Sequence, residues 1–385
     1  MKLLHLGDLH LGRSLGEYDL EEDQKYILDQ ILEIVKSREA DGVLIAGDVY
    51  DKAVPSEKAT RLLDYFLSSL LRLDKKVFMI SGNHDSDERL NYGSSIFAEN
   101  NIYIAAKYDG NLKRQSFDTG EEVADIYLMP FVKASQVKNY FPEAKIDSYD
   151  EAVRTVLEKA DIDRTHINIL LAHQFVTGKT EDPALSGSEG AGTRSVGLVE
   201  KVGYDCFDAF DYVALGHIHS PQRVGREGVR YSGSPLKYSL SEVNNSKSAV
   251  LVTIEGKGEP EIELIPLKPL RDLRHIRGKF MELLDRDNVK APEDFIYATL
   301  TDEETIDDAM NIFLQIYPNT VKIDYDNSHT RKEQFTDLSQ ITMNKSYSEI
   351  IEDFYRYMYG CDISEEEMAV MREVAGEAGV TDETR

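Results

Sequence analysis

Five short aliphatic runs in this 385-residue chain are each followed by polar residues of the types that bind metal ions. Such runs are typical of buried β-strands, and the polar residues stand at or just after the end of each run. Because ligands of open α/β sheets bind beyond the carboxyl ends of the strands, we expect these side chains to converge although they are far apart in the sequence. They are Asp8 and His10, Asp48, Asn83 and His84, His173, and His217 and His219.

A metal site is the chemistry that suits this set best. Taken singly, each histidine could be a satisfied core or capping side chain. Burying two carboxylates and four imidazoles together without a cation, however, costs several kcal/mol per charge. Seven donors indicate two ions, and mixed carboxylate and imidazole donors suit manganese, iron or zinc. The seven are Asp8, His10, Asp48, Asn83, His173, His217 and His219.

Two ions that share Asp48 would lie ~3.5 to 4 Å apart, clamp a phosphate between them and lower the pKa of a bound water. The sequence therefore predicts a phosphoesterase. His84 follows Asn83 directly and cannot easily turn to the same ions. We expect it to be the general acid that protonates the leaving oxygen, and the alternative is a hydrogen bond that supports a ligand. Asp51 and Asp85 are candidates either to fix histidine tautomers or to cap the helices that follow.

The elements that position these residues alternate between strands and amphipathic helices, which is typical of a layered α/β domain. Ser56, which follows Pro55, is expected to cap the helix that begins there. The expected strands are 3–6, 43–46, 77–80, 126–129, 167–172 and 212–215, and the expected helices include 21–38 and 56–73.

The last third of the chain changes character. Hairpin-like strands are expected at 225–231 and 248–254, followed by a linker at 260–269 and a domain boundary near residue 266. Strands at 273–278, 295–301 and 320–325, with helices near 281–285 and 305–317, predict a small α+β module. Two amphipathic helices with little core of their own are expected after residue 346; their apolar positions are Ile350, Ile351, Phe354, Tyr355 and Met358, and then Met368, Met371 and Val374.

Composition excludes several classes of protein. No apolar stretch approaches the roughly 20 residues of a membrane span, and the first residues lack the cleavage site of a signal peptide. The two cysteines, Cys206 and Cys361, have no metal-binding or disulfide pattern, so a cytoplasmic protein is expected. A net charge of −26 argues against coating nucleic acid by general basicity. The basic segment 266–280 either contacts phosphates or protects an edge strand.

Five motifs in order resemble those of the calcineurin-like metallophosphoesterases: GDLH at 7–10, GDVYD at 47–51, GNHD at 82–85, AHQ at 172–174 and GHIH at 216–219. Two longer segments, LHLGDLHLG at the start and YSGSPLKYSLSE at 231–242, further resemble the SbcD-type exonuclease subunits of SbcCD complexes. Asp51 departs from the wider nuclease family, whose archaeal and eukaryotic members carry a histidine there.

This resemblance implies a layered αββα sandwich with a small α+β capping domain and a C-terminal helical pair. The corresponding domains are 1–265 for the nuclease, 266–335 for the cap and 345–385 for helices that bind the coiled-coil base of an SbcC-type ATPase. It also implies two manganese ions, one held by Asp8, His10, Asp48 and His219 and the other by Asp48, Asn83, His173 and His217, with His84 as the acid.

The implied activity is ATP-dependent exonuclease and endonuclease cleavage of double-stranded DNA ends and hairpins, in DNA repair, replication and recombination. A homodimer through helices of the core is implied as well. Two other functions remain open from the residues alone. The chain could hydrolyse a small phosphoester or a phosphoprotein with the same core, or it could be a scaffold for DNA ends in which the metal serves only structure.

Overall fold

The structure is a computed structural model that describes residues 1–118, 122–178, 182–185, 201–328, 348–349, 351–352, 355–356 and 362–377. Contacts divide the chain into two units. The first consists of Met1–Ile276, Leu284–Ala298 and Asp308–Ile323, and the second of Arg277–Leu283, Thr299–Asp307 and Asp324–Arg385.

Two six-stranded sheets form the body of the first unit. One has the order β16-β15-β1-β4-β5-β6, and its strands are β16 (Glu261–Pro266), β15 (Ser248–Thr253), β1 (Lys2–Leu6), β4 (Gly42–Ala46), β5 (Lys76–Ile80) and β6 (Ile102–Ala105). The other has the order β13-β14-β12-β9-β8-β7, with β13 (Gln222–Val224), β14 (Arg226–Tyr231), β12 (Tyr212–Gly216), β9 (Ile167–His173), β8 (Val123–Leu128) and β7 (Lys113–Asp118). All six strands expected from the aliphatic runs are present, and β1, β4 and β5 run parallel, as do β8, β9 and β12.

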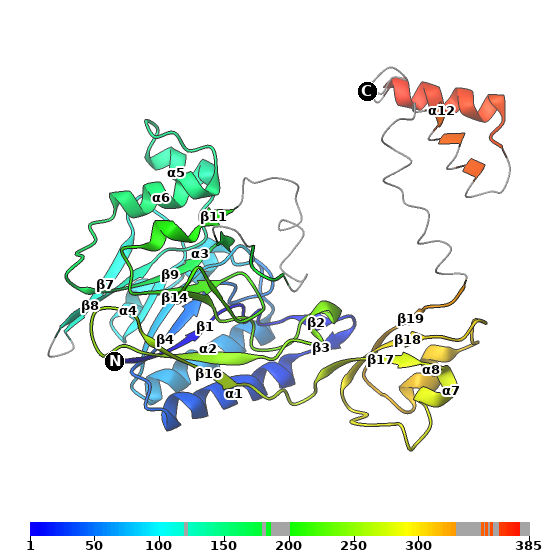
Figure 1. Cartoon of the computed structure of the whole chain (residues 1–385), viewed down its shortest axis with the longest axis horizontal. Helices are drawn as coiled ribbons and strands as arrows, with labels where there is room; N and C mark the ends of the chain where they lie inside the picture. Colours follow the sequence, from blue (N-terminus) through cyan, green and yellow to red (C-terminus); the bar gives the residue numbers. More distant parts are fainter. Residues whose placement is uncertain are drawn as a thin grey trace. The chain divides into compact units, whose positions relative to one another are not determined.

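Helices cover the outer faces of both sheets, as a layered α/β/β/α arrangement requires (Figure 1). Successive residues of a strand point to opposite faces, so Leu4 of β1 packs with the helices while Leu3 packs between the sheets. The helices α1 (Glu21–Ser37) and α2 (Glu57–Arg72) cover the first sheet, and α5 (Ala134–Tyr140) and α6 (Tyr149–Lys159) cover the second. The layered domain is therefore confirmed.

The two long helices begin where the sequence indicates. The Oγ of Ser56 accepts a hydrogen bond from the backbone N of Ala59, which confirms Ser56 as the N-cap of α2. Two short helices, α3 (Asp87–Leu90) and α4 (Ser94–Ala98), lie between β5 and β6 and leave Tyr92 and Ile96 exposed.

The linker expected at 260–269 is wrong, because β16 (Glu261–Pro266) pairs with β15 along its whole length. β16 is an edge strand with one neighbour, and only Ile265 of its six residues is buried. Such a strand has the polar composition of a loop, and Pro266 is tolerated at its end because an edge strand has no second neighbour to bond.

Beyond β16, the three expected strands are confirmed as β17 (Leu273–Gly278), β18 (Phe295–Leu300) and β19 (Thr320–Tyr325), in the sheet order β17-β18-β19. The helices of this module are α7 (Phe280–Leu283) and α8 (Ala309–Leu314), so the helix expected over 305–317 is shorter than predicted.

Three arginines of segment 266–280 pair with carboxylates of the protein. Within the first unit, Arg271 bonds Asp23 and Glu22, and Arg274 Nε lies 2.6 Å from Asp294 Oδ2. Within the second, Arg277 Nη2 lies 2.5 Å from Asp326 Oδ2. Since β17 lies at the edge of its sheet, these contacts favour the edge-strand interpretation over phosphate binding.

The second unit contains α12 (Glu365–Glu377), which confirms the last of the expected helices. Met368 is buried, whereas Val370 and Val374 are 58% and 56% exposed. The helix expected before it falls partly on residues 350, 353–354 and 357–361, and Cys361 is among these; they lie outside the described residues. No helix in the described part of the chain combines the length and apolarity of a membrane span.

Candidate metal centre

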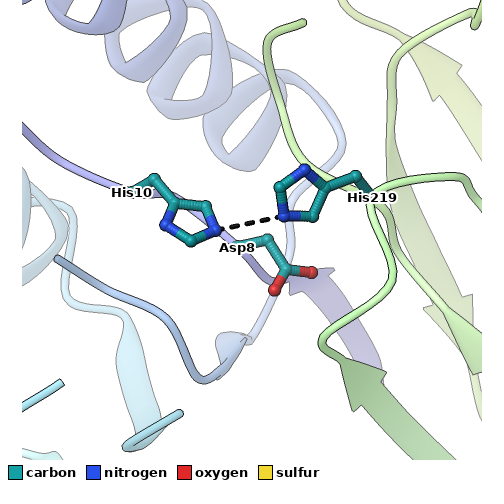
Figure 2. Close-up of side chains that lie close together, drawn as sticks. All are labelled: Asp8, His10 and His219. Carbon is teal, nitrogen blue, oxygen red and sulfur yellow. Dashed lines mark hydrogen bonds between the residues drawn. The ribbon is translucent and has the colours of Figure 1, made fainter. Parts of the chain in front are cut away.

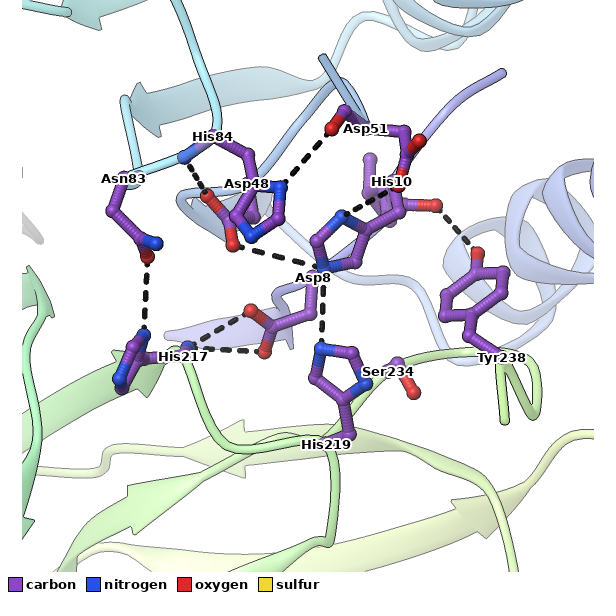
Figure 3. A network of polar contacts seen from close by, with 12 residues as sticks. Asp8, His10, Asp48, Asp51, Asn83, His84, His217, His219, Ser234 and Tyr238 are labelled. Carbon is purple, nitrogen blue, oxygen red and sulfur yellow. Dashed lines mark hydrogen bonds and ion pairs between the residues drawn. The ribbon is translucent and has the colours of Figure 1, made fainter. Parts of the chain in front are cut away.

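The candidate ligands stand at the carboxyl ends of five parallel strands that belong to two different sheets. Asp8 and His10 follow β1, Asp48 follows β4 and Asn83 follows β5; His173 ends β9, and His217 and His219 follow β12. The expectation of one open sheet edge was too simple. The two sheets bring their strand ends to the same place, and the ligand residues meet between them (Figure 3).

The donor atoms form overlapping groups. Asp8, His10 and His219 offer one ligand atom each within 4.8 Å of one another, as do Asp8, Asp48 and His173. In the first group, the Nε2 atoms of His10 and His219 lie 3.1 Å apart, with the Asp8 carboxylate beside them (Figure 2).

Asp48 and Asn83 connect the remaining donors. Asp48 Oδ2 lies 3.6 Å from His10 Nε2 and 3.4 Å from His173 Nε2, so it faces both groups. Asn83 Oδ1 lies 3.1 Å from His173 Nε2 and 3.1 Å from His217 Nδ1. All seven predicted ligands are therefore brought together.

The backbone at the ligands is strained. Asp8, His10, Asp48 and His217 have φ angles of 52°, 43°, 48° and 99°, in a region that residues with a Cβ rarely adopt. Each such residue costs of the order of 1–3 kcal/mol and persists only where the surrounding structure enforces it. Strain shared by four residues of one cluster makes this cluster the candidate functional site.

Glycines of the motifs let the two sheets approach at the site. A Cβ on Gly216 would lie 1.9 Å from the carbonyl oxygen of Ala46, which belongs to the other sheet. A Cβ on Gly82 would lie 2.1 Å from Asp48 Oδ1. No side chain fits at either position, so the glycine of each motif is needed to seat the ligand beside it.

The electrostatics of the cluster suit a divalent cation. Asp8 and Asp48 are buried, and burial together with the charge of Asp48 raises the pKa of Asp8 to about 6. Burial lowers the pKa of His217 to about 3 and also lowers that of His10. A cation would favour the ionised carboxylates and the neutral imidazoles together, which is the protonation state that ligands need.

Hydrogen bonds set two of the histidine tautomers. His173 Nδ1 donates to the carbonyl oxygen of Ala46 at 2.8 Å, and His219 Nδ1 donates to Glu242 Oε1 at 3.2 Å. In both rings the bond at Nδ1 leaves Nε2 to face the cluster, where it can bind a cation when it carries no proton. Glu242 was not among the predicted residues.

His84 lies at the open side of the site. Its ring is half-buried, and the neighbouring Asn83 is exposed, whereas Asp8, Asp48 and His173 are buried. The backbone N of His84 donates to Asp48 Oδ1 at 2.9 Å, and its Nδ1 donates to the carbonyl oxygen of Asp51 at 3.0 Å. Because Nδ1 is engaged in this way, Nε2 is the ring nitrogen that could exchange a proton with a substrate.

The structure shows what Asp51 and Asp85, the two acids with open roles, contact. Asp85 accepts hydrogen bonds from the backbone N atoms of Val49, Tyr50 and Gly82, so it ties the loops after β4 and β5 together, and neither predicted role is correct. Asp51 does stand beside a histidine, because its Oδ1 lies 3.7 Å from His10 Nδ1. Arg13 holds that carboxylate with a 2.7 Å ion pair.

Residues remote in sequence support the loop that carries His10. Gln24 Nε2 donates to the carbonyl oxygen of His10 at 2.7 Å, and Gln24 Oε1 accepts from the backbone N of Gly12 at 2.9 Å. Tyr238 Oη donates to the carbonyl oxygen of Leu9 at 2.5 Å. The only sequence signal for Tyr238 and Glu242 was their place in YSGSPLKYSLSE.

Comparisons with known proteins show which family the chain belongs to. Residues 1–221 match the family model of the calcineurin-like phosphoesterases, and residues 269–359 match a model described as the type 5 capsule protein repressor C-terminal domain. The SbcD subunit of the nuclease SbcCD from Staphylococcus epidermidis is 37% identical over 366 residues, 93% of each protein. A dimetal phosphatase from Danio rerio aligns with a TM-score of 0.38 and 12% identity, over 70% of this chain and 99% of that one. The chain belongs to the SbcD-type nuclease subunits of the calcineurin-like phosphoesterase family.

Proposed function

We propose that this chain is the nuclease subunit of an SbcCD-type complex and hydrolyses phosphodiester bonds of DNA at a centre of two divalent ions. The observation that carries the proposal is the convergence of carboxylate, amide and imidazole donors from five strand ends of two sheets. The Staphylococcus epidermidis relative, 37% identical over 93% of its length, is named a nuclease subunit, which supports DNA as the substrate.

The ligands divide into two sets around Asp48. Asp8, His10, Asp48 and His219 would hold one ion, and Asp48, Asn83, His173 and His217 the other. The distances from Asp48 Oδ2 to His10 and to His173 support its shared role. Manganese is proposed for both positions, because this mixture of oxygen and nitrogen donors without thiolates suits it.

The bound ions would polarise the phosphate and acidify the attacking water. The protein's own residues would position the general acid. The Asp48 carboxylate accepts a hydrogen bond from the backbone N of His84, and the carbonyl oxygen of Asp51 accepts one from the His84 ring. We propose that His84 then protonates the leaving oxygen as general acid.

The domains proposed are the nuclease domain at 1–265, the cap at 266–335 and the C-terminal helices at 345–385. The last of these would bind an SbcC-type ATPase. The exposed Val370 and Val374, one helical turn apart on α12, support this proposal, because an isolated helix gains little from apolar side chains in water. The proposed complex would cleave DNA ends and hairpins in repair, replication and recombination. We therefore propose a cytoplasmic location for it.

A homodimer through helices of the core is proposed as well. Tyr92 is 84% exposed, Ile96 66% and Phe97 36%, and all three belong to the short segment around α3 and α4. Three large apolar side chains gathered on one segment favour contact with a second copy.

Cleavage of two substrates separates this function from that of a small-molecule phosphoesterase. The chain is freed of metal with EDTA, supplied with Mn²⁺ and given a labelled double-stranded oligonucleotide or bis(p-nitrophenyl) phosphate. We expect cleavage of both. Hydrolysis of the small diester with intact DNA, at every DNA concentration and with the ATPase partner present, would contradict the nuclease function.

A further inference from the structure

A buried ion pair lies directly behind His219, on the side away from the candidate metal centre. Glu242 ends the short helix η4 (Leu240–Glu242) and is 0% exposed, and Lys247 is 7% exposed. Lys247 Nζ lies 2.5 Å from Glu242 Oε2. Neither residue belongs to a ligand motif.

Both members of the pair form hydrogen bonds with His219. Glu242 Oε1 accepts from the ring Nδ1 at 3.2 Å, and Lys247 Nζ donates to the backbone carbonyl oxygen of His219 at 2.9 Å. Ser234 Oγ accepts a further hydrogen bond from Lys247 at 2.8 Å. The main chain and the ring of His219 are thus held by one ion pair.

The position of the pair argues against a purely structural purpose. Taking two charges out of water is costly, and apolar residues of similar size would often serve stability equally well. Both oxygens of the Glu242 carboxylate are engaged, Oε1 by His219 Nδ1 and Oε2 by Lys247 Nζ. His10, whose ring faces His219, has its Nδ1 3.7 Å from the nearest Asp51 oxygen and lacks such a hydrogen bond.

The structure assigns to Glu242 and Lys247 the role of positioning residues that hold His219 with its Nε2 lone pair aimed at the metal centre. The inference rests on the proposed function in that His219 is taken as a ligand. A carboxylate behind a ligating histidine fixes its tautomer and orientation, and losing such a partner typically weakens metal binding ~10- to 100-fold.

Calorimetric titration of the metal-free full-length chain with Mn²⁺ tests this role. The variant E242M/K247M removes both charges with little change in volume, so no unpaired charge is left behind. We expect one of two binding events to weaken ~10-fold or more, while urea unfolding in EDTA stays close to that of the parent. The variant E242Q/K247M keeps an acceptor for His219 Nδ1, and we expect it to recover part of the lost affinity.

Asp125 supplies a matched control. It is 0% exposed, and its Oδ2 accepts from His166 Nδ1 at 2.9 Å, so it repeats the carboxylate–histidine contact on β8, apart from the ligand cluster. We expect D125N to bind Mn²⁺ like the parent.

Parental affinity in a folded E242M/K247M would overturn the positioning role, and so would an equal loss of affinity in D125N. If E242M/K247M does not fold, E242Q/K247M decides in its place: Mn²⁺ binding weaker than in the parent is expected of a positioning pair, and parental affinity in the folded E242Q/K247M would overturn the role. A parent chain that binds no Mn²⁺ would instead remove the proposed metal centre itself.

Discussion

His10 and His219, which are 209 positions apart in the sequence, lie with their Nε2 atoms 3.1 Å apart. His219 carries its proton on Nδ1, which donates to Glu242, so its Nε2 is an acceptor. The two rings come from the ends of β1 and β12, in different sheets. Two nitrogen atoms that face each other at this distance, beside the buried carboxylate of Asp8, form a place where a cation fits between donors.

His84→Ala removes the proposed general acid and leaves the ligand donors in place. Turnover of a DNA oligonucleotide should fall by ~10² or more, in line with the usual contribution of a general acid. The Mn²⁺ content, measured by mass spectrometry of the metal, should not change. Full turnover in this variant would exclude His84 as the acid.

The buried histidine His5 should make folding sensitive to acid. Burial lowers the pKa of His5 to about 3, and its Nδ1 bonds Tyr212 Oη at 2.8 Å. Above pH ~6.5, His5 is unprotonated in both the folded and the unfolded chain. As the pH falls toward about 3, the unfolded chain gains a proton that the folded chain refuses, which costs about 1.4 kcal/mol per pH unit.

His5→Asn keeps an acceptor for Tyr212 and removes this titration. Urea unfolding in EDTA at pH 7 and pH 5 should show the parent losing more stability than the variant, by roughly 2 kcal/mol. Equal losses in the two proteins would mean that His5 is protonated in the folded state.

The proposed dimer can be tested on α4. Ile96→Glu places a charge on a side chain that is 66% exposed and should not disturb the fold. Light scattering after size exclusion should give about twice 43.6 kDa for the parent and one chain mass for the variant. Met281→Glu is the matched control, because Met281 is 76% exposed on α7, and it should remain dimeric. A monomeric parent would contradict the dimer.

Removing the chain after Asn344 should separate catalysis from assembly. The shortened chain keeps every candidate ligand and should still hydrolyse bis(p-nitrophenyl) phosphate with Mn²⁺. It should no longer retain an SbcC-type ATPase in a pull-down, because α12 with its exposed Val370 and Val374 is gone. Undiminished retention of the ATPase would place its docking surface elsewhere in the chain.

The central strands and the convergence of the candidate ligands could be predicted because both leave local signals. β4 and β9 are buried on both faces and consist almost entirely of apolar residues; β9 ends at His173, and Asp48 stands two positions after the end of β4. The edge strands β7 and β16 could not be predicted in this way. Each of them pairs with a single strand and has one face in solvent. They therefore carry charged residues such as Lys113 and Glu263 and resemble loops in sequence.

Most residues that support the candidate ligands could not be predicted from the sequence, for a different reason. Glu242 acts on His219 across 23 positions and Gln24 on His10 across 14, through contacts that exist only after the sheets have assembled. Strand periodicity also could not predict that the candidate ligands come from two sheets. Leu3 and Leu4 are both buried, so the pattern does not indicate which face of the strand packs on a helix and which on a second sheet.

Cleavage of a labelled DNA hairpin by the purified chain and its Asp48→Ala variant, with Mn²⁺ and with or without an SbcC-type ATPase and ATP, tests the central claim most directly. Asp48 is the donor that faces both groups of ligands. The parent should cut the hairpin and cut faster with the ATPase and ATP, and the variant should show no cutting above background. Parental cleavage by a folded Asp48→Ala variant would contradict the two-ion centre.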